Sequence, residues 1–227
     1  MLAGRFPTTI LPHCSHRVLQ SQQWGVCMRL SFWFIIVSVI LLSIPFVVTQ
    51  HKGLLISAYN KYRVVFLDGG GEKCLRELEQ AEAVFKPLGN QGSTACPVKN
   101  AVRISKFKDT TLSSSVILSC PAAVDTANWL EEIEAKHITH MGTLNCRQRR
   151  GSGIMSEHSF GVAIDVSAID GNVVSKHWKD KGIKGETLRK AASVACKHFS
   201  NVLTPETNRL HHNHLHLDSG VGFNCNF

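Results

Sequence analysis

The chain has 227 residues, of which 44% are hydrophobic and 19% are charged, and its formal net charge at pH 7 is +8. This length and composition are typical of one globular domain with accessory segments, and nothing in them requires disorder or a repeat. Every acidic residue lies after residue 50, where 22 Lys and Arg stand against 17 Asp and Glu, a net charge of +5. There is no basic stripe interleaved with aromatic residues and no zinc-finger spacing, so we expect no nucleic-acid partner.

An uncharged stretch near the N-terminus, LSFWFIIVSVILLSIPFVVT at 30–49, predicts a membrane segment because its length suits a helix that crosses a bilayer. An uncleaved anchor is favoured over a cleaved signal peptide, since the apolar core is long and no small-x-small motif follows it. Residues 1–29 form an N-terminal extension, although a start at Met28 would place a short basic region before the apolar stretch. We expect residues 50–71 to be a linker.

The remaining chain shows a mixture of helical and strand periodicities. A helical pattern covers 72–86 and ends at Pro87, and a second helix starts at Pro121. The other expected elements are strands at 101–105, 115–120, 139–147, 161–169 and 211–218, and a helix at 185–199. These elements lack a regular β-α-β order, and no GxGxxG motif or phosphate loop occurs. We therefore expect an α+β domain with a central antiparallel sheet and flanking helices, and not a nucleotide enzyme.

Six cysteines are spread over this domain without a CxxC pair. They are Cys74, Cys96, Cys120, Cys146, Cys196 and Cys225. An even number beside a membrane signal favours three disulfides, and hence a domain outside the cytoplasm, over six buried thiols. The sequence leaves the pairing open.

The last predicted strand, HHNHLHLD at 211–218, places two histidines on one face because side chains alternate along a strand. These are His214 and His216, and two leucines face the opposite way. A possible partner is Asp165, which stands among branched apolar residues where an unpaired carboxylate is costly. His158 precedes it across a glycine-containing turn. His158, Asp165 and His216 would bind zinc and leave one position open, as in catalytic zinc sites.

The same segments resemble a known family. SEHSFGVAID is similar to the Ser-x-His-x-x-Gly-x-Ala-x-Asp motif of the zinc D-Ala-D-Ala metallopeptidases, in the wider lysostaphin, D-Ala-D-Ala metallopeptidase and hedgehog fold group. HLH resembles the second signature of that group. Together with NCR, AC and VLTPETN, these motifs are similar to the bacterial extensin-like protein family, so we assign residues 72–227 to one extensin-like metallopeptidase domain.

The resemblance implies a role for each site residue. The implied Zn²⁺ ligands are His158, Asp165 and His216. His214 would handle the proton of zinc-bound water or of the leaving amine, and Arg147 would face a substrate carboxylate or the developing oxyanion. His211 resembles a histidine of penicillin-insensitive murein endopeptidases and would orient substrate or support the ligands. Several D,D-dipeptidases also place a glutamate near the last ligand, but Glu206 and Asp218 do not match that spacing.

The implied function is a zinc-dependent peptidase of the cell envelope that hydrolyses peptidoglycan stem peptides or cross-links, as a D,D-carboxypeptidase or an endopeptidase. The alternatives are a zinc-stabilised binding domain of the envelope without turnover and a structural protein of the cell envelope that retains the motif. We expect the protein in the bacterial inner membrane with its domain in the periplasm, or free in the periplasm if the N-terminal segment is cleaved.

Overall fold

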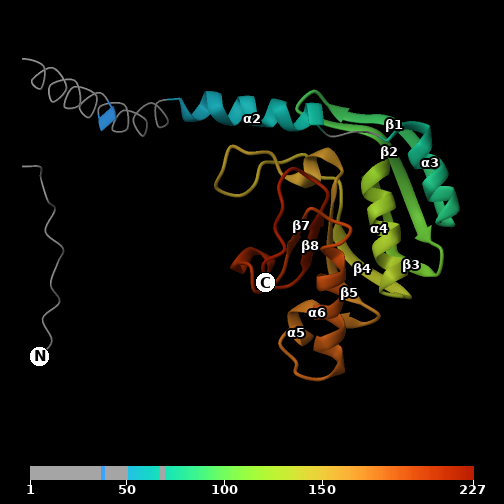
Figure 1. Cartoon of the computed structure of the whole chain (residues 1–227). Helices are drawn as coiled ribbons and strands as arrows, with labels where there is room; N and C mark the ends of the chain where they lie inside the picture. Colours follow the sequence, from blue (N-terminus) through green and yellow to red (C-terminus); the bar gives the residue numbers. More distant parts are fainter. Residues whose placement is uncertain (1–36, 39–50, 67–69) are drawn as a thin grey trace, which may run out of the picture. The chain divides into compact units, whose positions relative to one another are not determined.

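The computed structural model of the chain describes residues 37–38, 51–66 and 70–227 (Figure 1). The α-helices are α2 (Lys52–Phe66), α3 (Gly71–Gln80), α4 (Cys120–Glu132), α5 (Val174–His177) and α6 (Ile183–Ala195). Two short 3₁₀ helices are η1 (Glu157–Phe160) and η2 (Arg209–His211). The strands are β1 (Ala83–Ser93), β2 (Cys96–Phe107), β3 (Thr110–Ser119), β4 (His137–Gly142), β5 (Ala163–Ile169), β6 (Asn172–Val173), β7 (Asn201–Leu203) and β8 (Leu215–Asp218).

The strands form one sheet in the order β1-β2-β3-β4-β5-β8-β7, and β6 pairs with β5. The predicted α+β class is confirmed, but the sheet is mixed rather than antiparallel, because β3 and β4 pair in parallel. The reason is helix α4, which follows β3 and returns the chain to the end at which β3 began. In the described part of the chain, all other pairs of these strands are antiparallel.

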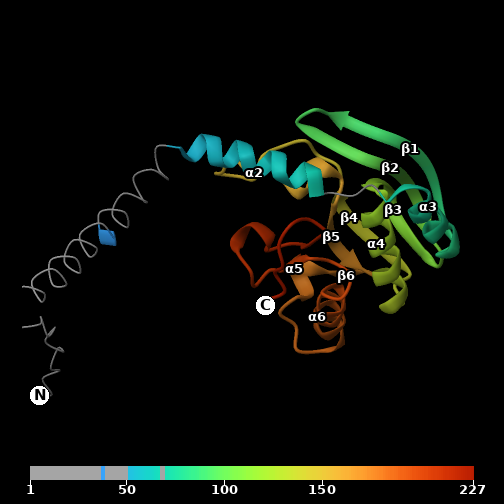
Figure 2. The same ribbon diagram turned by 45° about the horizontal axis from the view of Figure 1, so that its top comes forward.

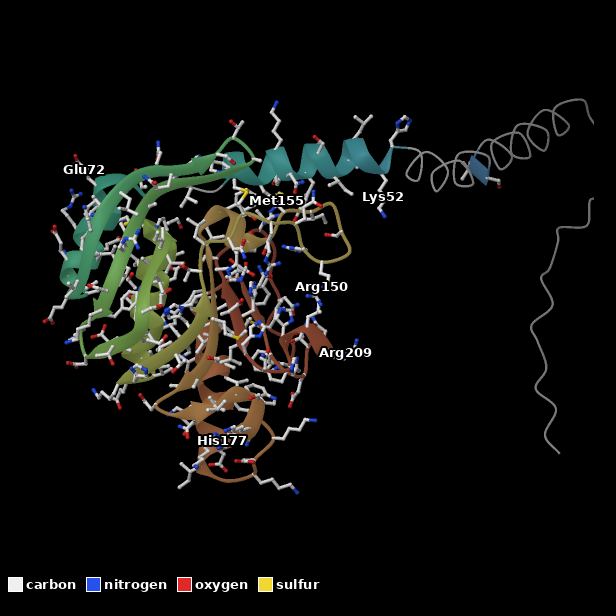
Figure 3. All side chains as sticks on the ribbon, turned by 180° about the vertical axis from the view of Figure 1, so that it is seen from behind. Lys52, Glu72, Arg150, Met155, His177 and Arg209 are labelled. Atoms are coloured by element: carbon white, nitrogen blue, oxygen red, sulfur yellow. A yellow bond between two sulfur atoms is a disulfide. The ribbon has the colours of Figure 1, made fainter. Side chains whose placement is uncertain are left out.

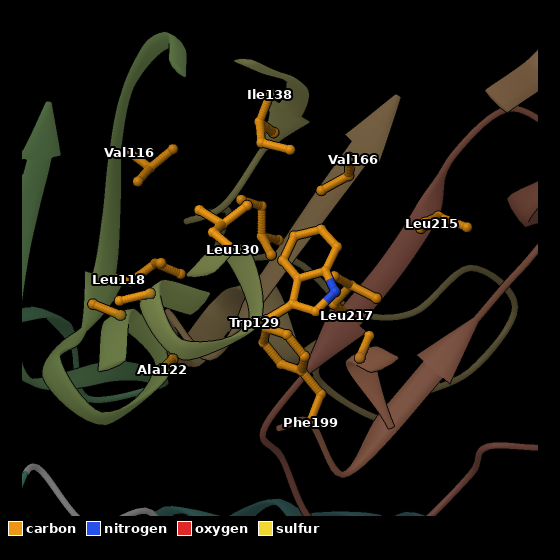
Figure 4. Close-up of a cluster of buried hydrophobic side chains, with 14 of the residues drawn as sticks. Val116, Leu118, Ala122, Trp129, Leu130, Ile138, Val166, Phe199, Leu215 and Leu217 are labelled. Carbon is orange, nitrogen blue, oxygen red and sulfur yellow. The ribbon is translucent and has the colours of Figure 1, made fainter. Parts of the chain in front are cut away.

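Helix α4 supplies the centre of the hydrophobic core (Figures 1 and 2). Its Trp129 is fully buried, and the indole nitrogen Nε1 donates to the Ala191 carbonyl of α6 at 2.9 Å. Phe199 packs edge-on against the Trp129 ring at 6.1 Å between centroids. Figure 4 shows these rings in the same cluster as Leu215 and Leu217 of β8. Core packing therefore holds β8 in place through the face opposite His216.

Three disulfides bridge the six cysteines, as predicted, and the structure supplies their pairing. Cys74 of α3 pairs with Cys120 at the start of α4, and Cys196, after α6, pairs with Cys225 near the C-terminus. The third pair, Cys96 with Cys146, joins the start of β2 to the segment that carries Arg147.

Several element predictions were wrong at their boundaries, and three of them differ most. The first helix ends at Gln80 rather than at 86, because Glu82 adopts a left-handed backbone (φ 53°) and the chain turns into β1. The strand predicted at 139–147 ends at Gly142, since the amide of Asn145 donates to the carbonyl of His158 instead of a strand partner. The last strand begins only at Leu215 and follows the η2 turn.

The N-terminal predictions fall mostly on residues that the structure does not describe. Of the predicted membrane segment 30–49, only Val37 and Ser38 are described, and they are helical. In the described part of the chain, no helix combines the length and the hydrophobicity that a membrane crossing needs. Residues 52–66 of the predicted linker form helix α2, and Figure 3 shows Met155 of the domain beside it.

Candidate metal site

Two of the three predicted ligands face each other across neighbouring strands. Asp165 of β5 and His216 of β8 are cross-strand partners in the antiparallel register. Their side chains therefore project from the same face, and the His216 Nδ1 atom lies 2.8 Å from the Asp165 Oδ1 atom. The residues on either side of them, Ile164 and Leu217 among others, are buried in the core, so the strand alternation that the sequence shows holds the two ligands in place.

The third predicted ligand, His158, comes from the η1 turn that leads into β5. This turn ends at Gly161, whose φ of 65° favours glycine, and an added Cβ there would lie 2.8 Å from the Val98 Cγ1 atom. The His158 Nδ1 atom lies 2.5 Å from the Thr143 carbonyl oxygen, to which it donates. This bond directs the Nε2 atom towards Asp165, whose Oδ2 atom lies 3.1 Å away.

The three side chains have the spacing of a metal site. Besides the two contacts of Asp165, the His158 Nε2 and His216 Nδ1 atoms lie 3.2 Å apart. Ligand atoms about 2.0–2.1 Å from a tetrahedral zinc ion lie roughly 3.3 Å from one another. One atom from each of His158, Asp165 and His216 falls within 4.8 Å of the others, so the cluster could hold a metal ion. All three side chains are at least largely buried.

Asp218 is a residue of this site that the sequence analysis dismissed. The His216 Nε2 atom lies 3.0 Å from the Asp218 Oδ2 atom, which leaves Nδ1 directed at the ligand cluster. The Oδ1 atom of Asp218 accepts from the Asn201 Nδ2 atom at 2.8 Å and from the Gly220 amide at 2.9 Å. A carboxylate that orients a ligating imidazole in this way is typical of metal sites. Strand parity puts Asp218 on the side of His216, and that signal could have identified it.

The charges of the site depend on these contacts in the metal-free protein. Burial acts to raise the pKa of Asp165, but hydrogen bonds from His158 and His216 outweigh it and hold that pKa well below its usual range. Burial acts in the opposite direction on His216 and is also outweighed, because hydrogen bonds to Asp165 and Asp218 raise the pKa of His216 to about 9. The protonated His216 ring can therefore donate to Asp165 through Nδ1 and to Asp218 through Nε2.

His214 and His211 lie beside the ligands without completing the ligand set. The His214 Nε2 atom is 3.5 Å from the Asp165 Oδ1 atom, and His214 itself is buried although it precedes β8. The His211 ring lies 5.1 Å from that of His214 and 5.6 Å from that of His216, between centroids. Burial lowers the pKa of His214. Burial and the neighbouring imidazoles lower the pKa of His211 to about 4, so it is neutral at pH 7.

Arg147 is held near the site by its backbone. Its amide donates to the Ser159 Oγ atom at 3.0 Å, and its carbonyl accepts from the same hydroxyl at 2.8 Å. These bonds fix the segment against η1, but the side chain is exposed. Within residues 51–66 and 70–227, the Arg147 guanidinium makes no hydrogen bond or ion pair, so the structure does not bring it into contact with the cluster.

Glu157 and Arg63 are two further charged residues near the site that the sequence did not predict. Glu157, the neighbour of His158, is buried and pairs with Arg149 at 2.7 Å and with the fully buried Arg63 of α2. No sequence signal links residue 63 to residue 157, because their contact depends on how α2 packs. Glu206, the other acidic residue that the sequence places near the last predicted ligand, accepts a hydrogen bond from the Trp178 indole nitrogen at 3.2 Å.

Fold and site together define an α+β protein with a buried His-Asp-His cluster that could hold a metal ion. The family model described as Extensin-like protein C-terminus matches residues 72–225, and the chain therefore belongs to the extensin-like protein family. No curated protein and no solved structure matches the chain. The relation to zinc D-Ala-D-Ala metallopeptidases and to the hedgehog-type fold stays a prediction from the two sequence motifs.

Proposed function

We propose that this protein is a zinc-dependent peptidase of the bacterial cell envelope that cleaves peptide bonds of peptidoglycan. The observation that carries the proposal is the spacing of His158, Asp165 and His216: the His158 Nε2 and His216 Nδ1 atoms lie 3.2 Å apart, and they lie 3.1 Å and 2.8 Å from the two carboxylate oxygens of Asp165. Two imidazoles and one carboxylate are a donor set typical of catalytic zinc, which keeps a fourth position for water or substrate. The metal's contribution would be to polarise the scissile carbonyl and to make a water more acidic.

His214 is the residue we assign to proton transfer. Its Nε2 atom lies 3.5 Å from the Oδ1 atom of Asp165, so His214 lies beside the residues that would hold the metal but is not one of them. Burial lowers its pKa, so the ring is neutral at pH 7 and can accept a proton from the attacking water. The resulting imidazolium would be stabilised by the charge of Asp165 and could then protonate the leaving amine.

The substrate class follows from the two motifs and from Arg147. An exposed guanidinium on a segment held against η1 can bind the terminal carboxylate of a stem peptide through two hydrogen bonds. A free carboxylate of this kind ends the stem peptides on which D,D-carboxypeptidases act, whereas an endopeptidase would cleave the cross-links between them.

The proposed location is the periplasm, with or without a membrane anchor. Three disulfides persist only in an oxidising compartment, and the uncharged stretch at 30–49 would direct the chain across the inner membrane.

One observation favours the alternative, a zinc-stabilised binding domain of the envelope without turnover. The acidic residues that adjoin the ligands, Glu157 and Asp218, are engaged by arginines and by His216, so neither is placed to act as the glutamate base of several D,D-dipeptidases. Catalysis then depends on His214 alone.

The experiment compares three preparations: the parent, His214→Ala and the control His212→Ala. His212 is exposed, and its Nδ1 atom lies 3.0 Å from the Arg209 carbonyl oxygen. We expect zinc to stay bound in all three, while muropeptide cleavage, read by mass spectrometry, falls about 10²–10⁴-fold in His214→Ala alone. Equal cleavage by the parent and His214→Ala would remove His214 from the mechanism. A zinc-loaded parent that cleaves neither cross-linked nor uncross-linked muropeptides would establish the binding domain instead.

A further inference from the structure

Helix α2 contacts η1 and the segment that leads into it through one face. Ile56, Asn60 and Arg63 lie four and three residues apart and therefore share this face. The Ile56 side chain lies against Gly153, where an added Cβ would be 3.1 Å from its Cγ2 atom. The Asn60 amide bonds to the Gly153 carbonyl and the Met155 amide, both at 3.1 Å, and the Arg63 Nη1 atom donates to the Met155 carbonyl at 2.7 Å. The segment before η1 thus takes its backbone partners from α2.

Arg63 is the most buried charge in this contact. Its side chain is 0% exposed and pairs with Glu157, whose side chain is 2% exposed. The guanidinium carbon lies 4.9 Å from the centre of the Phe160 ring, at the end of η1. A buried arginine is costly unless it is paired, and removing it leaves an uncompensated buried carboxylate. The second partner of Glu157, Arg149, is about half exposed and compensates less.

Glu157 connects Arg63 to two of the three ligands. It immediately precedes His158 in η1. Its carboxyl group also lies close to Asp218, with Gly220 between them: a Cβ added to Gly220 would be 2.4 Å from the Glu157 Cδ atom and 2.9 Å from the Asp218 Oδ1 atom. Asp218 in turn accepts from the Nε2 atom of His216. Arg63 therefore pairs with one of two neighbouring buried carboxylates: Glu157, which precedes His158 in the chain, lies close to Asp218, which contacts the His216 imidazole.

We propose that Arg63 is a positioning residue of the metal site and that helix α2 is part of that site. By neutralising Glu157 and binding the Met155 carbonyl, Arg63 holds η1 and Asp218 so that His158 and His216 present their ligand nitrogens together. Undocking of α2 would separate the two imidazoles. Arg63 lies outside the family match at 72–225, so this support is a feature of the chain's N-terminal part. The proposal rests on the proposed function only in taking the cluster as a metal site.

The test measures metal binding by the full chain, with Zn²⁺ and with Co²⁺ as a spectroscopic probe. Arg63→Met removes the charge and keeps much of the volume, and Lys61→Ala is the control because Lys61 is exposed on the same helix. We expect Arg63→Met to weaken metal affinity about 10–100-fold, the range typical of residues that orient ligands, and to change the visible spectrum of bound Co²⁺. Lys61→Ala should match the parent in both readouts. Arg63→Lys should recover part of the affinity, because an ammonium keeps the charge but cannot bridge Glu157 and the Met155 carbonyl as a guanidinium does.

Parent-like affinity and an unchanged Co²⁺ spectrum in Arg63→Met would overturn the proposal. If Arg63→Met does not fold, Arg63→Lys decides: weakened affinity with a changed spectrum supports the proposal, and parent values in both refute it. If the parent binds no metal, the proposed function fails separately, and amide hydrogen exchange of residues 156–161 in the metal-free protein then decides about Arg63. Faster exchange in Arg63→Met than in Lys61→Ala would support the positioning role, and equal protection would exclude it.

Discussion

Replacing Asp218 with Asn tests whether the carboxylate behind His216 sets the metal-binding form of that imidazole. The Asp218 Oδ1 atom accepts two hydrogen bonds, from Asn201 and Gly220, while Oδ2 accepts from the His216 Nε2 atom. An Asn that keeps its oxygen towards Asn201 and Gly220 turns its NH₂ group towards His216. The ring must then accept at Nε2 and carry its proton on Nδ1, the atom that faces the ligand cluster. An Asn with the opposite orientation places its NH₂ group against two other donors.

Both orientations of the new amide oppose metal binding, so the loss belongs at the upper end of the range for residues that orient ligands. We expect zinc affinity to fall about 100-fold or more, which corresponds to about 2.8 kcal/mol. Competition titration against a chelator of known affinity measures the change. Asp125→Asn is the matched control, because Asp125 is a largely buried carboxylate that accepts from Ser219, the neighbour of Asp218, without touching His216. Zinc affinity of Asp218→Asn within the error of the parent would refute the tautomer argument.

Two further predictions concern the segment that carries Arg147. Arg147→Ala should leave zinc affinity unchanged and raise the KM for stem peptides with a free terminal carboxylate at least about tenfold. The reason is that a hydrogen bond to a charged group contributes about 1.5–3 kcal/mol. An unchanged KM for these peptides would exclude this contact. Replacing Cys96 and Cys146 together by Ala should lower the free energy of unfolding by about 4 kcal/mol for a separation of 50 residues, as measured by urea denaturation, and a loss no larger than in a surface Ser→Ala control would contradict it.

The sequence predicted which residues form the candidate cluster better than it predicted the contacts that hold these residues in place. Asp165 and His216 could be found because each alternates with apolar residues in its strand, and alternation in sequence becomes a shared face in the sheet. That β5 and β8 are neighbours, with these two residues in register, does not follow from alternation and is shown only by the structure. The sequence placed His214 on the side of His216 by assuming that both lie in one strand. His214 does lie near Asp165, but it precedes β8, so strand alternation does not explain its position.

The contacts that hold the ligands could not be read from the sequence because they join distant segments. The Thr143 carbonyl that orients His158 lies in a segment predicted as a strand, where it would have had a strand partner. Arg63 lies in helix α2, in a segment that we expected from the sequence to be a linker. The parallel pairing of β3 with β4 depends on the return of the chain through α4. The sequence did predict a strand, a helix and a strand in this region. A single strand-helix-strand unit was too little to suggest a mixed sheet.

The pH dependence of metal binding follows from the charge of His216 in the metal-free protein. Its pKa is raised to about 9, above its ordinary value of 6.5, by the facing carboxylates Asp165 and Asp218. The stabilisation from this proton is fully present below pH 6.5 and is lost as the pH rises through 9. A metal ion needs the neutral Nδ1 atom and must displace the proton in this window. We expect zinc affinity to rise about tenfold per pH unit between pH 7 and 8.5 beyond any change in the free metal, with release of one proton per ion, as measured by calorimetry in buffers of different ionisation enthalpy. Asp218→Asn removes one of the two carboxylates that hold the proton, so its proton release at pH 7 should be smaller than that of the parent. Zinc affinity independent of pH in the parent would show that His216 is already neutral and that Asp165 and Asp218 do not raise its pKa.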